Sequence, residues 1–109
     1  MAGELRHISS SEVARELALR SAEARRATKR FKESIARGEV GVEEAFDSPL
    51  VARVRVVSFL QCFRGIGPTI ANDFMSQAHV APDRRVGGLG PHQREKLVDL
   101  VGRVLERQR

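Results

Sequence analysis

The stretch Phe63-Arg64-Gly65-Ile66-Gly67-Pro68-Thr69-Ile70-Ala71 is the part of the chain that decides the fold. Glycine permits positive φ, and here two glycines flank one apolar residue, Ile66. Proline is tolerated in the first turn of a helix, where its missing N–H is no loss. We therefore predict two helices joined by a tight turn, with Ile66 plugged into the core.

This turn is of the helix-hairpin-helix type, which binds the backbone of nucleic acids with little regard to sequence. Glycines leave no Cβ between backbone and ligand, and free N–H groups at the start of the second helix can hold a phosphate oxygen. Candidate binding residues here are Arg64, Gly65, Gly67 and Thr69. The alternative is a plain glycine turn between helices. A dinucleotide fold is disfavoured, because the third glycine and a preceding strand are missing.

Helical periodicity continues after the turn. A pattern runs to about Gln77, with one face formed by Ile70, Ala71, Phe74 and Met75. The Gly-apolar-Gly-Pro tetrad recurs as Gly88-Leu89-Gly90-Pro91 and opens a last helix. That helix has a regular apolar stripe of Leu97, Leu100, Val101, Val104 and Leu105.

The segment 51–63, before the turn, is ambiguous. Val54 and Val56 alternate with arginines, as in a strand, whereas Val56, Phe59, Leu60 and Phe63 fit a helical stripe. We favour a helix, because the sequence offers no convincing partner strand. Cys62, on this apolar pattern, is expected to be a small core residue.

A long helix is expected at the N-terminus. Ser9 and Glu12 have capping-box spacing, and no Gly or Pro follows before Gly38. Its apolar stripe is thin: Val13, Leu17, Ala24, Phe31 and Ile35. Much of the helix should therefore project from the core. The opposite face is basic and either lies along a duplex or is merely solvated: Arg15, Arg25, Arg26, Lys29 and Lys32.

Together these patterns predict a single all-α domain in three parts. Residues 1–8 form a flexible tail, 9–38 a long basic helix and 39–109 a compact helical body. Gly38 and Gly41 stop the long helix, and a short helical turn over 42–46 ends at Ser48-Pro49.

The charge of the chain points to an anionic partner. The 19 Lys and Arg exceed the 14 Asp and Glu by five, and the pI is about 10.6. No run of about 18 apolar residues occurs, so a membrane span is not expected. Cys62 is the only cysteine, which suits a reducing compartment, and no secretory signal is visible, so we expect a cytoplasmic protein. Trp and Tyr are absent, which disfavours a base-stacking binder of single strands.

A second candidate binding element is Arg84-Arg85-Val86-Gly87-Gly88-Leu89-Gly90. Paired arginines on a glycine-rich loop can bracket phosphates or enter a minor groove, although such a loop can also be plain solvated surface. The three histidines are scattered and Cys62 lacks a partner, so neither a metal set nor a nucleophile is suggested. We expect that the protein is not an enzyme and that it binds no cofactor and no small-molecule substrate.

The order of these elements resembles the actinobacterial integration host factor family over roughly residues 12–105. It comprises a basic Ala-rich helix, Arg37-Gly38-Glu39, the Gly65-Ile66-Gly67 turn, Arg84-Arg85-Val86 and a second glycine turn. That family is unrelated in fold to the heterodimeric bacterial factor of the same name. The resemblance implies a nucleoid-associated protein with a helix-two-turns-helix body that binds duplex DNA. It also implies phosphate contacts at the backbone of Gly65 and Gly67, and DNA contacts at Arg84 and Arg85.

The chain departs from the family pattern at several basic positions. Gly87 stands where the family usually has Arg, Pro68 where it has Lys, and Ile70 and Asn72 where basic residues are common. The resemblance then implies one of two things. Either the affinity for DNA is lower than in the family, or the DNA-binding surface has shifted to other residues. The candidates for a shifted surface are Arg53, Arg55, Arg64 and Arg94.

The function expected from the sequence is a monomeric protein of the nucleoid that binds double-stranded DNA with little specificity and bends or compacts it. Two rivals stay open. One is a ribosome-associated RNA binder, because a similar element occurs in a small-subunit ribosomal protein. The other is a protein-interaction adaptor that uses the long helix and has lost strong DNA binding.

Overall fold

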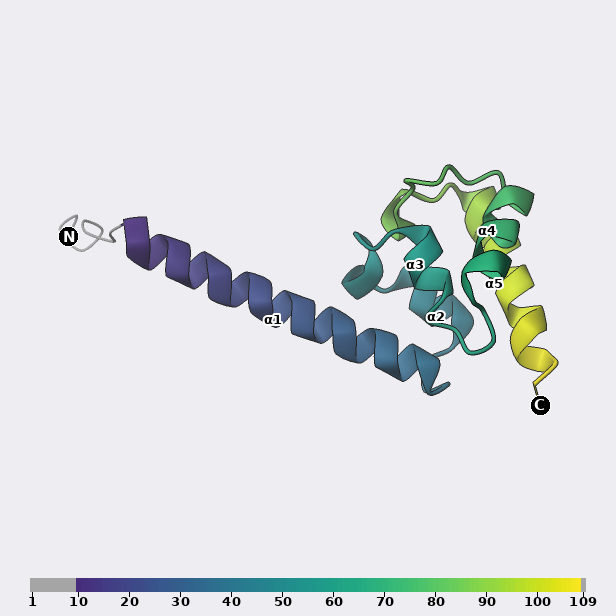
Figure 1. Ribbon diagram of the computed structural model, residues 1–109, viewed down its shortest axis with the longest axis horizontal. Coiled ribbons are helices and arrows are strands. Elements are labelled where there is room, and N and C mark those ends of the chain that lie inside the picture. Colours follow the sequence, from purple (N-terminus) through teal and green to yellow (C-terminus); the bar gives the residue numbers. More distant parts are fainter. Residues whose placement is uncertain (1–9, 109) are drawn as a thin grey trace.

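The regular structure of the protein is helical, as predicted (Figure 1). The computed structural model describes residues 10–108. The α-helices are α1 (Ser10–Ala36), α2 (Val42–Asp47), α3 (Val56–Leu60), α4 (Pro68–Gln77) and α5 (Pro91–Glu106). Two 3-10 turns, η2 (Pro49–Val51) and η3 (Val86–Gly88), complete the body. Within the described residues the only β pairing is one isolated antiparallel bridge, between Arg55 and Arg85.

Helices α2–α5 enclose one apolar core. Three aromatic rings form its centre: Phe59 meets Phe46 edge-on at 4.9 Å and Phe63 edge-on at 5.4 Å, measured between ring centroids. Edge-to-face contacts of this kind suit the ring quadrupoles. Helix α5 supplies Leu97, Leu100 and Val101 of the stripe recognised in the sequence.

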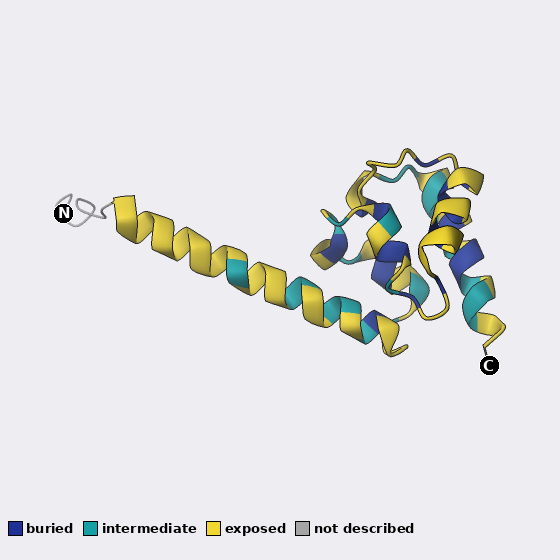
Figure 2. Cartoon of the chain, viewed as in Figure 1, coloured by how far each residue is buried: buried dark blue, intermediate teal, exposed yellow. Residues whose placement is uncertain are grey.

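Helix α1 leaves this body as a rod (Figures 1 and 2). Only its C-terminal end is anchored, through buried Ile35, half-buried Phe31 and a 3.0 Å hydrogen bond from Thr28 Oγ1 to the Leu50 carbonyl. Towards the N-terminus Val13 and Leu17 are 41% and 55% exposed. The radius of gyration is therefore 18.1 Å, against about 13 Å for a compact domain of this length. The projection expected from the thin stripe is confirmed.

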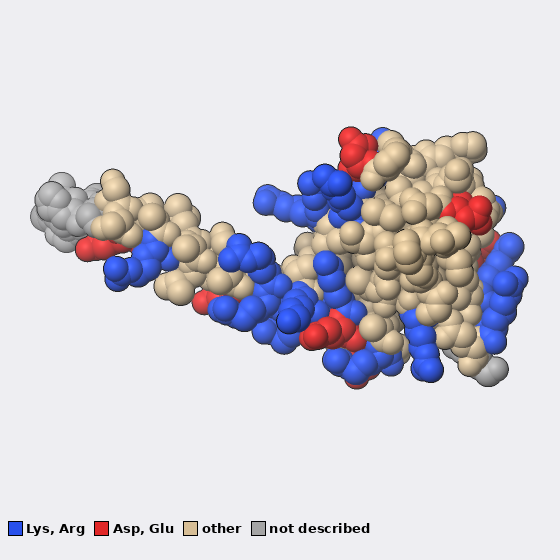
Figure 3. All heavy atoms as spheres, viewed as in Figure 1, with Lys and Arg blue, Asp and Glu red and all other residues tan. Residues whose placement is uncertain are grey.

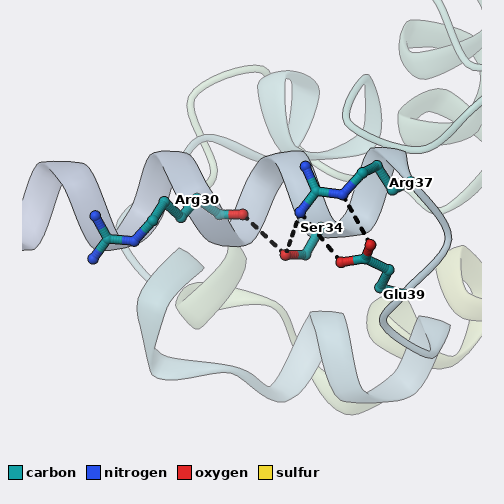
Figure 4. A network of polar contacts seen from close by, with 4 residues as sticks. All are labelled: Arg30, Ser34, Arg37 and Glu39. Atoms are coloured by element: carbon teal, nitrogen blue, oxygen red, sulfur yellow. Dashed lines mark hydrogen bonds and ion pairs between the residues drawn. The ribbon is translucent and has the colours of Figure 1, made fainter.

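The end of α1 is set by Gly38, as predicted. Its φ is +77°, and its N–H donates to the Ile35 carbonyl at 3.0 Å. Beyond the last turn, Arg37 donates to both carboxylate oxygens of Glu39, at 2.9 and 3.2 Å, and to Ser34 Oγ (Figure 4). This guanidinium holds the pKa of the Glu39 carboxyl below its usual range. The predicted tail 1–8 and the predicted cap at Ser9 lie outside the described residues.

The prediction of one helix over 51–63 is wrong at both ends of that range. Only Val56–Leu60 forms α-helix, and Val51 belongs to a 3-10 turn. The segment between them pairs with residues 84–87, which are remote in sequence. The alternation of Val54 and Val56 was therefore a genuine strand signal, realised as a single bridge.

Two expectations about burial also need correction. Ile70 is 39% exposed, because the core face of α4 is formed by Ala71, Phe74 and Met75 and ends short of it. Cys62 is only half-buried, in the turn after α3, where its thiol donates to the Ser58 carbonyl at 3.6 Å. Burial raises the pKa of this thiol.

Candidate nucleic-acid interface

The turn between α3 and α4 has the predicted form. Gly65 has φ +90°, and the Ile66 N–H donates to the Phe63 carbonyl at 3.2 Å. The Ile66 side chain is 4% exposed and so plugs the turn into the core. Pro68 occupies the first turn of α4, directly after Gly67 at the N-cap.

The two glycines of the turn have different roles. A Cβ on Gly65 would lie 2.4 Å from Gln108 Nε2 and 3.3 Å from Val104 Cγ1, so α5 covers this side of the residue. Gly67 has φ −95° and ψ −174°, which any residue adopts, and a Cβ there would meet nothing within 4 Å. Of the two, only Gly67 leaves its Cβ side open to a ligand.

The start of α4 presents unused hydrogen-bond donors. Among residues 10–108 no protein acceptor is found for the N–H groups of Gly67, Thr69 and Ile70, and Pro68 has no N–H. All four residues are exposed. Free donors at the positive end of a ten-residue helix suit an anion, and the Thr69 hydroxyl can add a further donor.

A short antiparallel pairing brings together the arginines that the sequence places 30 positions apart. Three hydrogen bonds of 2.9 Å hold it: Val56 N to Arg84 O, Val86 N to Val54 O, and Gly87 N to Ala52 O. As a result, Arg53, Arg55, Arg84 and Arg85 share one edge of the body, which we call the arginine edge. All four side chains are exposed.

The arginine edge concentrates positive charge. Arg55 and Arg85 stand directly opposite each other at the bridge, and like charges in that position are destabilising. In the described part of the chain no carboxylate forms an ion pair with any of the four. Arg84 donates to the Gly88 carbonyl at 2.9 Å and Arg85 to the Arg53 carbonyl, so both guanidinium groups are oriented by backbone. An anion would relieve the repulsion.

Gly87, one of the departures from the family pattern, lies close against the paired segment. A Cβ at this position would lie 3.0 Å from the Ala52 carbonyl oxygen and 3.1 Å from the Ala52 Cβ. A side chain here would need the neighbouring segment to shift by a few tenths of an ångström. The absence of a basic side chain at position 87 is thus linked to the close packing of the two segments that form the arginine edge.

Two further candidates stand apart from the edge. Arg64 is exposed and lines a shallow hollow in front of the turn, together with Arg37. Arg94 is half-buried and makes two 2.8 Å hydrogen bonds to the Asp47 carboxylate, which joins α5 to α2. Its DNA-binding role stays a prediction, with its guanidinium already occupied by Asp47.

Basic side chains also follow α1. Arg25, Lys29 and Lys32 line a hollow along this helix with Thr28 and Ala24. Figure 3 shows blue side chains along the lower side of α1 and a second group on the edge of the body that faces back along the helix.

One residue that contacts the turn was missed by sequence reasoning. Gln108 Nε2 donates to the Arg64 carbonyl at 2.7 Å, across 44 positions of sequence. A polar residue just beyond the last helix carries no periodic or motif signal that could have found it.

The part of the chain that the structure describes offers no candidate metal site and no candidate membrane-spanning helix. Residues 10–108 contain no group of three or more His, Cys, Asp or Glu arranged to hold a metal ion. Over the same residues, no helix is long and apolar enough to cross a membrane.

Comparison with known proteins gives one family match and several similar proteins. Residues 30–100 match the S13-like H2TH domain family. An integration host factor from Mycobacterium tuberculosis is 29% identical over 87 residues, which is 76% of this chain and 83% of that protein. A guanylate kinase from Leifsonia xyli subsp. xyli is 44% identical over 45 residues, but these are only 18% of the kinase and 41% of this chain.

A solved structure shares the fold. The structure of sIHF bound to an 8-bp palindromic DNA matches with a TM-score of 0.62 at 22% identity. The match covers 82% of this chain and 96% of that one, so it includes most of the described elements.

Proposed function

We propose that this chain, which belongs to the S13-like H2TH domain family as an integration host factor-like member, is a nucleoid-associated protein that binds double-stranded DNA. The membership was expected from the Gly65-Ile66-Gly67 turn and the motifs downstream of it, and the family match over residues 30–100 confirms it.

The observation that carries the proposal is the arginine edge. Four exposed arginines from two remote segments are held together at the N-terminal end of α3, and no carboxylate among residues 10–108 forms an ion pair with them. The turn with its free N–H groups follows the other end of the same helix. Helix α3 has five residues, about 7.5 Å of helix, and Gly67 follows seven residues after its end, so we propose that both elements contact one duplex.

The chemistry of these elements favours the phosphate backbone over the bases. Backbone N–H groups and guanidinium groups bind phosphate oxygens, and such contacts position a protein without reading the sequence. We therefore propose binding with little sequence preference. Bending or compaction of the DNA, and a place in the cytoplasmic nucleoid, are proposed with it on the family resemblance. The basic face of α1 offers a further stretch of positive charge to a bent duplex.

The test is a titration of a labelled random 20-bp duplex at two salt concentrations. Each phosphate contact adds about 0.9 to the slope of log K against log salt. Arg55→Ala should reduce affinity and lower the slope by about one unit. The matched control is Arg103→Ala, which removes an exposed arginine paired with Asp99 on α5. Absence of salt-dependent binding by the wild-type protein would refute the proposal.

A second candidate is structured RNA, and the S13-like description of the matching family favours it. Both nucleic acids offer phosphates, so the turn alone does not separate them. Competition between the 20-bp duplex and a hairpin RNA of equal charge decides between them. Preferential displacement by the RNA would assign the site to RNA.

A further inference from the structure

The C-terminal end of α5 lies beside the turn that presents the phosphate donors (Figure 1). Gln108 lies two residues beyond Glu106, the last residue of α5, and its N–H donates to the Leu105 carbonyl at 3.2 Å. Its side chain reaches Arg64, 44 positions earlier, through the 2.7 Å hydrogen bond to the main-chain carbonyl. A weaker contact of 3.4 Å runs back to the Val104 carbonyl.

Gln108 and Gly65 fit each other closely. The Gln108 amide occupies the place that a side chain on Gly65 would fill, because a Cβ there would lie 2.4 Å from Nε2 and 3.4 Å from Cδ. Among the described residues no other donor reaches the Arg64 carbonyl. The absence of a side chain at position 65 therefore makes room for Gln108 in addition to permitting the φ of +90°.

The contact fixes one peptide group. The Arg64 carbonyl belongs to the peptide that leads into Gly65, and rotation of this peptide would change the φ of Gly65. That change would redirect the following backbone, including the N–H of Gly67. A binding group that is already oriented loses less freedom on binding, so fixing this peptide favours affinity.

We propose that Gln108 is a positioning residue for phosphate binding, which holds the Arg64–Gly65 peptide so that the donors of the turn face the DNA. The inference rests on the proposed function. It makes the end of α5 part of the binding apparatus, although Gln108 itself touches no phosphate.

The test replaces Gln108 by a residue of similar length that has no donor. Gln108→Met should weaken binding of the random duplex between about two- and tenfold, the range of one hydrogen bond. The salt slope should stay unchanged, because no phosphate contact is removed. The matched control is Gln77→Met, since Gln77 is also an exposed glutamine and donates to the Asp73 carboxylate at 2.8 Å on α4. It should bind like the wild type.

Several results would overturn the inference. Wild-type affinity in Gln108→Met would show that the turn needs no support from α5. A salt slope lowered by about one unit would show a direct phosphate contact instead. An equal loss in Gln77→Met would show a general effect of losing a surface hydrogen bond.

A second measurement keeps the inference separate from the proposed function. If the wild-type protein binds no duplex, the proposed function fails, and the turn is then examined by NMR. The readouts are the chemical shifts of Gly65 and Gly67 and the hydrogen exchange of the Ile66 amide, which donates to Phe63. Altered shifts and faster exchange in Gln108→Met, but not in Gln77→Met, support positioning. Identical spectra around the turn overturn it.

Discussion

Substitution of Gly67 by aspartate should raise stability and lower DNA affinity at the same time. Gly67 is the N-cap of α4, its backbone is in the extended region, and a Cβ there meets nothing within 4 Å. Aspartate is a better N-cap than glycine by a few tenths of a kcal/mol, and loss of glycine stiffens the unfolded chain. We expect a gain of about 0.5–1 kcal/mol in the free energy of unfolding, which raises the melting temperature by about 2–8 °C.

The same carboxylate should repel a phosphate bound at the turn. Two like charges about 4 Å apart interact with about 1 kcal/mol at the dielectric constant of water and up to about 4 kcal/mol at an effective value near 20. Even the lower figure weakens binding about fivefold. Because salt screens this repulsion, the loss should shrink as salt concentration rises.

The matched control for this substitution is Gly67→Asn, which has nearly the same shape and also caps the helix, but carries no charge. Thermal unfolding by circular dichroism and anisotropy titrations with the random duplex compare the two variants. If Gly67→Asp is folded and binds DNA as tightly as Gly67→Asn, no phosphate lies near Gly67 and the assignment of the turn fails.

Three further substitutions test the site and its support. Ile66→Ala should cost about 2–5 kcal/mol of unfolding free energy in denaturant titrations, because its side chain is 4% exposed; a loss below 1 kcal/mol would contradict the plug. Arg84→Ala combined with Arg85→Ala should lower the salt slope by up to about two units and weaken random duplexes nearly alike. Sequence-selective loss would instead indicate readout of groove shape. Gly87→Ala should destabilise the protein by about 1–3 kcal/mol, because the new Cβ lies 3.0 Å from the Ala52 carbonyl oxygen; unchanged stability would show that the pairing relaxes freely.

The elements that could be predicted are those with local signals. Pro68 and Pro91 open α4 and α5 after a Gly-apolar-Gly segment, and Gly38 terminates α1 with its positive φ. Each signal is a property of a few neighbouring residues, so it can be interpreted without knowledge of the rest of the fold. The apolar stripe of α5 is equally local, and it correctly predicted which face of that helix packs against the core.

The errors arose where distant segments meet. The first half of 51–63 is not helical, because its backbone hydrogen bonds go to residues 84–87. Nothing in the sequence of either segment indicates that the two segments pair. Ile70 was misplaced, because the width of the buried face on α4 depends on the neighbouring helices. Gln108 was missed for the same reason, since its partner is a carbonyl group and not a side chain. The four arginines were identified one by one, but their assembly into one edge required the bridge.

The unsupported part of α1 has a consequence for calorimetry. Residues 10–20 are exposed throughout, so their helicity depends on alanine content and local pairs such as Glu16–Arg20, with N···O 2.9 Å. Isolated helices of such length are marginal in water and melt gradually. On warming, this segment should fray from its free end before the core unfolds in one cooperative step. Ellipticity then declines over a broad range, while the heat absorption peak reports the core alone, and the enthalpy per residue falls below the usual value of about 0.7 kcal/mol.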